Sequence, residues 1–158
     1  MAGFTLSSDH FMGQVPPECR FDGLGVGGNN LSPQLRWSNP PAGTKSYILF
    51  LHDPDAPAPN GFMHWCAFNI PASVTELKAG ASTDGMPEGT VQCQNGFGNY
   101  RYDGAAPPPG DAPHAYHLTL YALDTVLDLD GSADPSKVVF MAMANIIGKT
   151  GLVAYFGR

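Results

Sequence analysis

Glycine and proline recur along the whole chain, with 19 glycines and 15 prolines among 158 residues. Both disfavour helices, because glycine loses much conformational freedom on ordering and proline lacks the amide hydrogen that a helix interior uses. This composition excludes a helix bundle. It is typical of folds in which many short strands are joined by elaborate loops.

The length of the chain fits a single domain, expected to cover residues 1–158. A chain of this size can bury enough apolar surface to fold without a disulfide or a metal. The cysteines, Cys19, Cys66 and Cys93, are odd in number and far apart, with no CxxC pair. We therefore expect buried, reduced thiols and no metal or other cofactor.

The charge of the chain argues against two classes of partner. The formal net charge is −6, with only eight lysines and arginines. Nucleic-acid-binding proteins carry clustered basic residues, and attraction to an anionic membrane surface needs them too. No run approaches the roughly 18 apolar residues that cross a bilayer. The first residues lack the basic and apolar regions of a secretory signal, so a cytoplasmic protein is expected.

Hydrophobic patterning predicts the strands. Residues 46–52 form a near-continuous apolar run, which is typical of a central strand buried on both faces. Residues 114–123 are rich in aromatic and β-branched side chains, as strands are. Shorter strands are expected at residues 4–7, 35–37, 64–70, 90–94 and 152–156.

One helix is expected near the C-terminus. Asp134 is a suitable N-cap residue, and Pro135 suits the first helical position. Residues 136–147 are long enough for three turns, and Gly148 would end them. The predicted fold class is therefore mostly β, β-sandwich-like or α+β, with this helix and short additional helices.

Two proline-rich segments that end in histidine carry the candidate chemistry. In residues 53–65, Asp53 and Asp55 flank a proline at the end of a predicted strand, and His64 follows nine residues later. Proline stiffens such a loop, which can then hold side chains in one binding geometry. The structural alternative is a turn in which the aspartates cap backbone amides.

The second segment, residues 104–116, repeats this arrangement. Three consecutive prolines precede His114 and Tyr116 at the start of a predicted strand. The structural alternatives are a polyproline II linker and a histidine that merely ends a strand. We expect the two segments to meet and form one small-ligand pocket.

The order and spacing of short motifs resemble the phosphatidylethanolamine-binding protein family, in particular its bacterial Raf kinase inhibitor-like branch. The motifs are DPDAP and GxxHW in the first segment, then APPPG and HxY in the second, followed by YALD. Further segments that are similar to the family lie at residues 30–37, 40–46 and 69–71. The resemblance covers nearly the whole chain.

The resemblance implies a two-sheet β fold with a small pocket at one end that accepts phosphate-like groups, including a phospholipid headgroup. It also implies inhibition of a kinase or a serine protease in some members, and a homodimer among bacterial relatives. Carried over by motif, the anion-binding residues would be Asp53, Asp55, His64, Pro107, Pro108, His114 and Tyr116.

The chemistry of these side chains constrains the ligand. The two histidines and the Tyr116 hydroxyl can donate hydrogen bonds to a phosphate, whereas ionised Asp53 and Asp55 can only accept them. The carboxylates are expected to accept from His64 and His114 and to favour their charged forms. We therefore predict that phosphate binding weakens as the pH rises through neutrality.

The sequence departs from the family pattern at several positions. Ala115 stands where an arginine is common, which removes a cation and predicts weaker anion binding. Ala105 and Ala106 occupy variable places before the prolines, with one proline fewer than is usual in the bacterial branch. Asn145 stands where the bacterial branch often has histidine.

Two kinds of enzyme are alternatives to a binding protein. A metal-dependent hydrolase could use residues of metal-ligand type, namely His52, Asp53, Asp55, His64, His114 and His117. Strand alternation opposes their convergence, because His114 and His117 should face opposite sides, as should His52 and Asp53. A cysteine nucleophile at Cys66 would share a strand face with His64 but lacks an evident activating pair. No known catalytic motif occurs, so an enzyme is not expected.

Overall fold

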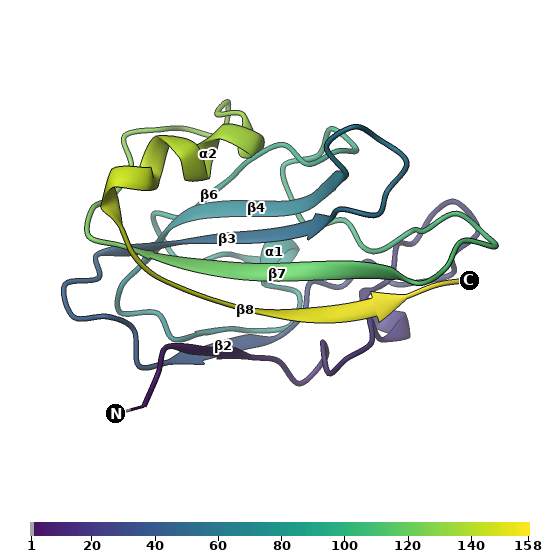
Figure 1. Cartoon of the computed structure of the whole chain (residues 1–158), viewed down its shortest axis with the longest axis horizontal. Coiled ribbons are helices and arrows are strands. Elements are labelled where there is room, and N and C mark those ends of the chain that lie inside the picture. The colour runs from purple at the N-terminus through teal and green to yellow at the C-terminus, as the bar shows by residue number, and fades with distance from the viewer. Residues whose placement is uncertain (1) are drawn as a thin grey trace.

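The computed structural model describes residues 2–158. Its strands form two antiparallel sheets, as Figure 1 shows. The larger sheet has the strand order β6-β4-β3-β7-β8, with bounds Val91–Gln92, Phe62–Pro71, Ser46–Asp53, His114–Leu123 and Ile146–Phe156. The smaller has the order β1-β2-β5, with bounds Thr5–Ser7, Leu35–Ser38 and Glu76–Leu77. The predicted mostly β fold is confirmed, and β3 is the central strand, as expected.

The main core lies between the two sheets. Alternation along each strand places one set of side chains on this side, and burial of their apolar surface stabilises the sandwich. The fully or almost fully buried members include Leu35, Trp37 and Leu77 from the small sheet and Tyr47, Leu49, Leu51, Trp65 and Leu118 from the large one. The Trp37 and Tyr47 rings meet edge to face with their centroids 5.4 Å apart.

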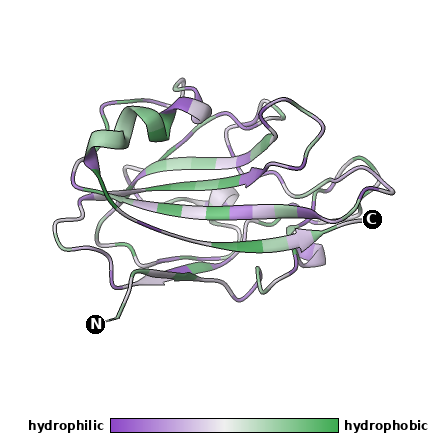
Figure 2. Ribbon diagram, in the orientation of Figure 1, coloured by the Kyte–Doolittle hydropathy of each residue, from purple (hydrophilic) through white to green (hydrophobic). Residues whose placement is uncertain are grey.

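Helix α2, Pro135–Ala142, covers the opposite face of the large sheet (Figure 1). Figure 2 shows hydrophobic residues along much of this helix. Asp134 caps it as predicted, because its side chain accepts a hydrogen bond of 3.0 Å from the Ser136 amide. A second buried cluster lies beneath the helix and contains Ile48, Phe50, Cys66, Phe68, Cys93, Leu123, Val138 and Ala142.

The predicted C-terminal end of this helix is wrong. The helix was expected to continue to residue 147, but it ends at Ala142 and is followed by a 3₁₀ turn, Met143–Asn145. Ile146 already pairs with Leu123 in the sheet and is the first residue of strand β8, a conformation that its β-branched side chain favours. Gly148 lies inside β8 rather than ending the helix, and β8 is longer than the predicted strand at residues 152–156.

The remaining short elements agree with the expected pattern. Short helices occur at Ala81–Asp84 (α1) and at Pro17–Cys19, a 3₁₀ turn. Strand β6 is a two-residue part of the strand predicted at residues 90–94. Within residues 2–158, no helix has both the length and the apolar character that spanning a membrane requires.

A β-bulge in β4 determines where His64 points. Leu51 of β3 pairs with Trp65, but the next residue of β3, His52, pairs with Met63, so His64 is an extra residue in β4. Bulges redirect side chains and are frequent beside functional sites. Met63 packs beneath α2, whereas His64 faces the end of the main core. The expectation that His64 and Cys66 share a strand face is therefore wrong, because Cys66 lies beneath α2.

Candidate functional site

The two proline-histidine segments meet at one end of the large sheet and enclose a pocket of about 210 Å³. Five of the seven residues predicted for an anion site line this pocket, namely Asp53, His64, Pro107, Pro108 and His114. Asp53 is the last residue of β3 and His114 the first of β7. Neighbouring antiparallel strands thus deliver both residues to the same edge of the sheet.

His114 is held between two carboxylates. Its Nδ1 atom lies 2.7 Å from Asp53 Oδ2, and its Nε2 atom lies 2.9 Å from Asp111 Oδ2. Burial by itself lowers the pKa of His114, but the hydrogen bonds to Asp53 and Asp111 outweigh it, so the pKa is raised. Both ring N–H groups of the resulting imidazolium are therefore already used within the protein.

His64 has the opposite protonation state. Its Nδ1 atom lies 2.8 Å from the backbone oxygen of Asp103, which can only accept, so Nδ1 carries the hydrogen. Burial lowers the pKa of His64 to about 4, which leaves the ring neutral at pH 7. The other nitrogen, Nε2, then offers a lone pair. The expectation of a charged His64 beside a carboxylate is wrong, since only His114 has that arrangement.

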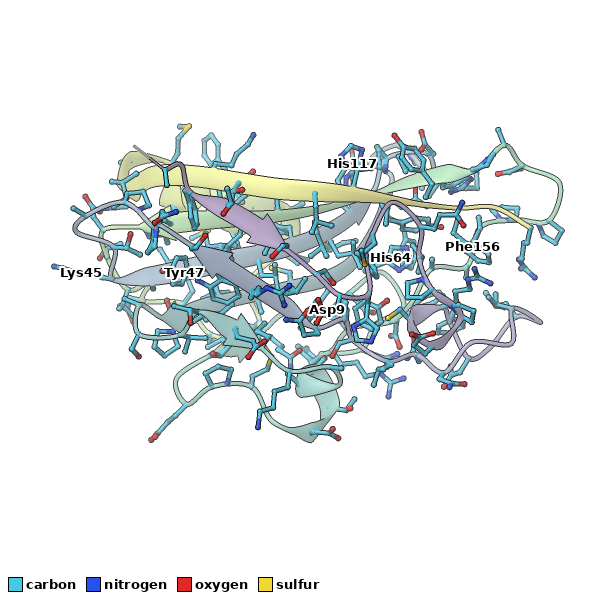
Figure 3. All side chains as sticks on the ribbon, turned by 90° about the horizontal axis from the view of Figure 1, so that it is seen from below. Asp9, Lys45, Tyr47, His64, His117 and Phe156 are labelled. Carbon is cyan, nitrogen blue, oxygen red and sulfur yellow. The ribbon has the colours of Figure 1, made fainter. Side chains whose placement is uncertain are left out.

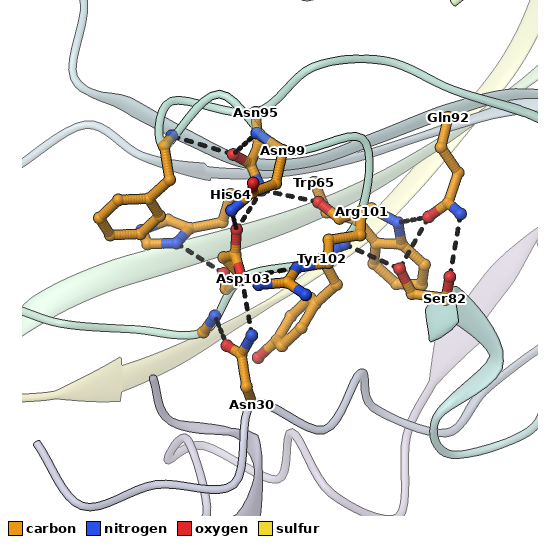
Figure 4. A network of polar contacts seen from close by, with 12 residues as sticks. Asn30, His64, Trp65, Ser82, Gln92, Asn95, Asn99, Arg101, Tyr102 and Asp103 are labelled. Atoms are coloured by element: carbon orange, nitrogen blue, oxygen red, sulfur yellow. Dashed lines mark hydrogen bonds and ion pairs between the residues drawn. The ribbon is translucent and has the colours of Figure 1, made fainter. Parts of the chain in front are cut away.

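A buried network fixes the carbonyl group that orients His64 (Figure 4). The Asp103 carboxylate is fully buried and accepts hydrogen bonds from the amides of Asn30 at 2.7 Å, Asn95 at 2.7 Å and Asn99 at 2.8 Å. Arg101 Nε donates to it at 3.1 Å. Burial acts to raise the pKa of Asp103, but these partners outweigh it and the pKa is lowered. The carboxylate therefore stays ionised and anchors the segment.

Two of the predicted residues do not line the pocket. Asp55 is exposed, and its Oδ2 atom accepts a hydrogen bond of 2.8 Å from the Ala115 amide, which ties the loop to β7. Tyr116 is buried below the pocket, with its ring centroid 5.5 Å from that of His64. Its hydroxyl has no hydrogen-bond partner among residues 2–158. Burial, with the Asp53 carboxylate nearby, raises the pKa of Tyr116.

The sequence model described as "Phosphatidylethanolamine-binding protein" matches residues 7–157. The chain belongs to the phosphatidylethanolamine-binding protein family. A relative, the UPF0098 protein YbhB of Escherichia coli K12, is 38% identical over 146 residues, 90% of this chain and 92% of YbhB. The UPF0098 protein YbcL of the same organism is 44% identical over 131 residues, 80% of this chain and 72% of YbcL.

Solved structures of family members share this architecture. The crystal structure of E. coli YbcL superposes with a TM-score of 0.94 at 38% identity and covers 99% of both chains. A carboxypeptidase Y inhibitor, solved with its cognate proteinase, reaches a TM-score of 0.55 at 19% identity over 98% of this chain and 83% of its own. The latter likeness shows the fold alone.

The prediction from sequence did not name several residues that line the pocket of this family member. The apolar wall is completed by Leu24, Ala56, Pro57, Phe62, Phe97 and Ala106. Phe97 lies in a loop that carries no distinctive motif, and its contact with the Phe62 ring, at 4.7 Å between centroids, depends on the tertiary fold. Asp111, three residues before His114, was the one partner that spacing alone could have suggested.

Arg158 places a cation beside the pocket, although position 115 itself holds alanine. Arg158 donates from Nε to the backbone oxygen of Pro107 at 2.7 Å. Its guanidinium therefore sits against the proline wall, and its remaining N–H groups keep a positive charge near the pocket. No sequence motif marks this residue.

The residues proposed for a metal-dependent hydrolase do not converge. His52 and His117 lie on the α2 side of the large sheet, away from Asp53, His64 and His114. Within residues 2–158 no group of three or more His, Cys, Asp or Glu side chains could hold a metal ion, so the hydrolase alternative gains no support.

The cysteines of this family member are free and buried, as expected. A hydrogen bond with the Cys93 thiol and burial both raise the pKa of the Cys66 thiol. A raised pKa disfavours the thiolate that a nucleophile needs.

Proposed function

We propose that this protein binds a small molecule through a phosphate group that still carries a proton. The observation that supports this is the hydrogen bond from His64 Nδ1 to the Asp103 carbonyl, which leaves Nε2 as an acceptor at the pocket. A phosphate monoanion has both an O–H donor and acceptor oxygens. A fully ionised phosphate dianion has acceptors only.

The charges around the pocket favour the same ligand state. Asp53 is an acceptor. His64 donates its one N–H to the Asp103 carbonyl, and His114 uses both of its N–H groups on carboxylates, so neither imidazole ring offers a free donor to the ligand. A dianion would therefore face lone pairs at His64 and a carboxylate at Asp53. The guanidinium of Arg158 supplies a positive charge nearby, and the proline and phenylalanine walls suit an organic group attached to the phosphate.

Calorimetric titration at two pH values tests this proposal. A phosphate monoester has a second pKa of about 6, so the monoanion is abundant at pH 5.5 and scarce at pH 8. The affinity for O-phosphoethanolamine should fall by about 75-fold between these values, following the monoanion fraction. The affinity for inorganic phosphate should fall by much less, because its second pKa is higher. Dimethyl phosphate, a diester with no such proton, should bind weakly at both. Equal affinities of phosphoethanolamine at both pH values would overturn the proposal.

Matched histidine variants locate the binding. His64→Ala should weaken phosphoethanolamine binding by at least about tenfold at pH 5.5, because the acceptor is lost. His10→Ala removes a histidine outside the pocket and should leave the affinity unchanged. A His64→Ala protein that folds and binds normally would contradict the assignment. Inhibition of a kinase or a serine protease, a homodimer and a cytoplasmic location stay predictions.

A further inference from the structure

Three side chains with metal-binding chemistry lie in one row across the large sheet, outside the pocket. His52 of β3 pairs with His117 of β7 on one side and with Met63 of β4 on the other. All three are half-buried. The alternation of β3 and β7 and the bulge in β4 put them on the α2 face, whereas Asp53 and His64 face the pocket.

The three side chains share one groove between α2 and the sheet, with a volume of about 320 Å³. In Figure 3, the labelled side chain of His117 on β7 lies well away from that of the pocket residue His64 on β4. The groove is also lined by Phe50, Thr119, Tyr121, Pro135, Ser136 and Val139. None of these lining residues is a carboxylate, so the groove offers imidazole nitrogens and a thioether sulfur as its strongest ligands.

His52 is already oriented in the manner of a metal ligand. Its Nε2 atom lies 2.8 Å from the backbone oxygen of Asn60, so Nε2 carries the hydrogen and Nδ1 keeps its lone pair. Histidines that bind metals generally donate their other N–H to a carbonyl or a carboxylate in this way. Gly61 permits the close approach of the loop, because a Cβ atom there would lie 2.9 Å from His52 Nε2.

The strand register brings the ligands within reach of one ion. Directly opposed residues on antiparallel strands have Cβ atoms about 4.5–5.5 Å apart. Two imidazoles at that separation can contact the same metal at the usual distance of about 2.0 Å. Met63 is directly opposed to His52 on the third strand, and its unbranched thioether side chain is flexible enough to reach the same ion.

We propose that His52, His117 and Met63 form a binding site for one copper(I) ion. Thioether sulfur is a soft ligand that selects copper(I), and imidazole also suits copper, whereas magnesium and calcium require oxygen ligands. Zinc sites are generally completed by thiolate, histidine or carboxylate ligands, and the groove holds no third group of that kind. The site is separate from the phosphate pocket and does not depend on it.

Competition with a chromogenic copper(I) chelator under anaerobic conditions tests the site. The protein should withdraw one equivalent of copper(I). His117→Ala should weaken this binding by about 100-fold or more, because one of two imidazole ligands is lost. Met63→Leu should weaken copper(I) binding by about tenfold, because leucine keeps the volume but removes the soft sulfur.

Two controls separate this result from unspecific binding or misfolding. His10→Ala should bind copper(I) like the unmodified protein. In the unmodified protein, NMR should show that copper(I) shifts the ring resonances of His52 and His117 and leaves those of His64 and His114 in place. The proposal is overturned if no saturable equivalent binds, if folded His117→Ala binds equally well, or if the pocket histidines shift instead.

Discussion

Asp53 Oδ2 lies 2.7 Å from His114 Nδ1, and both side chains are almost completely buried. Asp111 occupies the other ring nitrogen at 2.9 Å. The two carboxylates outweigh the effect of burial and raise the pKa of His114. In the folded protein, His114 therefore stays protonated to a higher pH than in the unfolded chain. Folding of the protein is therefore coupled to the protonation of His114.

His114→Gln should destabilise the protein in a pH-dependent manner. A histidine whose pKa is raised by folding stabilises fully below its unfolded pKa of about 6.5, and this contribution is lost as the pH rises through the folded pKa. Urea unfolding at pH 6 should show that the variant has a free energy of unfolding lower by about 3 kcal/mol, and this difference should be smaller at pH 9. Asp111→Asn, at a partly exposed partner, should cost less than about 1 kcal/mol. A loss that is identical at both pH values would contradict this linkage.

His64 should make stability change with pH in the opposite direction. Its pKa is about 4 in the folded protein, against 6.5 for an ordinary histidine, so the unfolded chain takes up a proton first as the pH falls. The free energy of unfolding should therefore decrease by roughly 3 kcal/mol from pH 6.5 to pH 4 through this group. His64→Gln, which does not titrate, should flatten that part of the profile. An unchanged slope in the variant would show that other groups produce it.

Asp103→Ala should disturb both folding and His64. The change leaves the amides of buried Asn95 and of partly buried Asn30 and Asn99 without their carboxylate acceptor, which should cost about 3 kcal/mol or more in unfolding free energy. Nitrogen NMR should also show His64 losing its fixed Nδ1–H form. Arg101→Ala is the matched control, because its half-exposed side chain donates to the same carboxylate and should contribute less than about 1 kcal/mol. Equal effects of the two variants would argue against the network.

Gly61→Ala and Gly43→Ala form a matched pair in the left-handed backbone region, at φ of +67° and +89°. A Cβ atom at Gly43 meets nothing within 4 Å, so its cost should be only the backbone strain of about 1–2 kcal/mol. At Gly61 the added atom would lie 2.3 Å from the Asp53 carbonyl oxygen. Unfolding should therefore show a clearly larger loss for Gly61→Ala. Similar losses would mean that the loop adjusts freely.

Arg158→Ala should weaken phosphoethanolamine binding by about threefold at low salt, as expected for one partly solvated charge. The difference should fade in high salt, because screening shortens the range of the guanidinium charge. Calorimetry at two ionic strengths measures this, and Arg36→Ala, which removes a cation paired with Asp9, serves as the control. An effect that persists in high salt would point to lost packing against Pro107 instead.

Much of the fold could be predicted because local patterns and tertiary structure agree. The strand predicted at residues 114–123 has the observed bounds, since its apolar residues alternate and its aromatic and β-branched side chains suit a sheet. The Asp134–Pro135 start of α2 is equally local. The helix end was missed because Ile146 is recruited by Leu123 across the sheet, a contact that no local pattern reveals.

In the candidate site, too, local motifs predicted some features, whereas others depend on tertiary contacts. Motif order brought Asp53, His64, Pro107, Pro108 and His114 together correctly as neighbours around one pocket. The protonation states could not be predicted, because they depend on partners that are distant in sequence. The carbonyl that orients His64 is 39 residues away, and the Asn30 amide that binds the Asp103 carboxylate is 73 residues from it.

The extra residue in β4 aligns Met63 with His52 and places His64 on the pocket side of the sheet. Met63 and His64 are consecutive and, as alternation requires, face opposite sides of the sheet, Met63 toward the groove under α2 and His64 toward the pocket. A substitution at one of these positions therefore reaches only one of the two cavities. Strands β3, β4 and β7 supply residues to both cavities. Residues on one side of these strands can change under selection while those on the other side are kept, so two recognition surfaces can evolve independently on one small sheet.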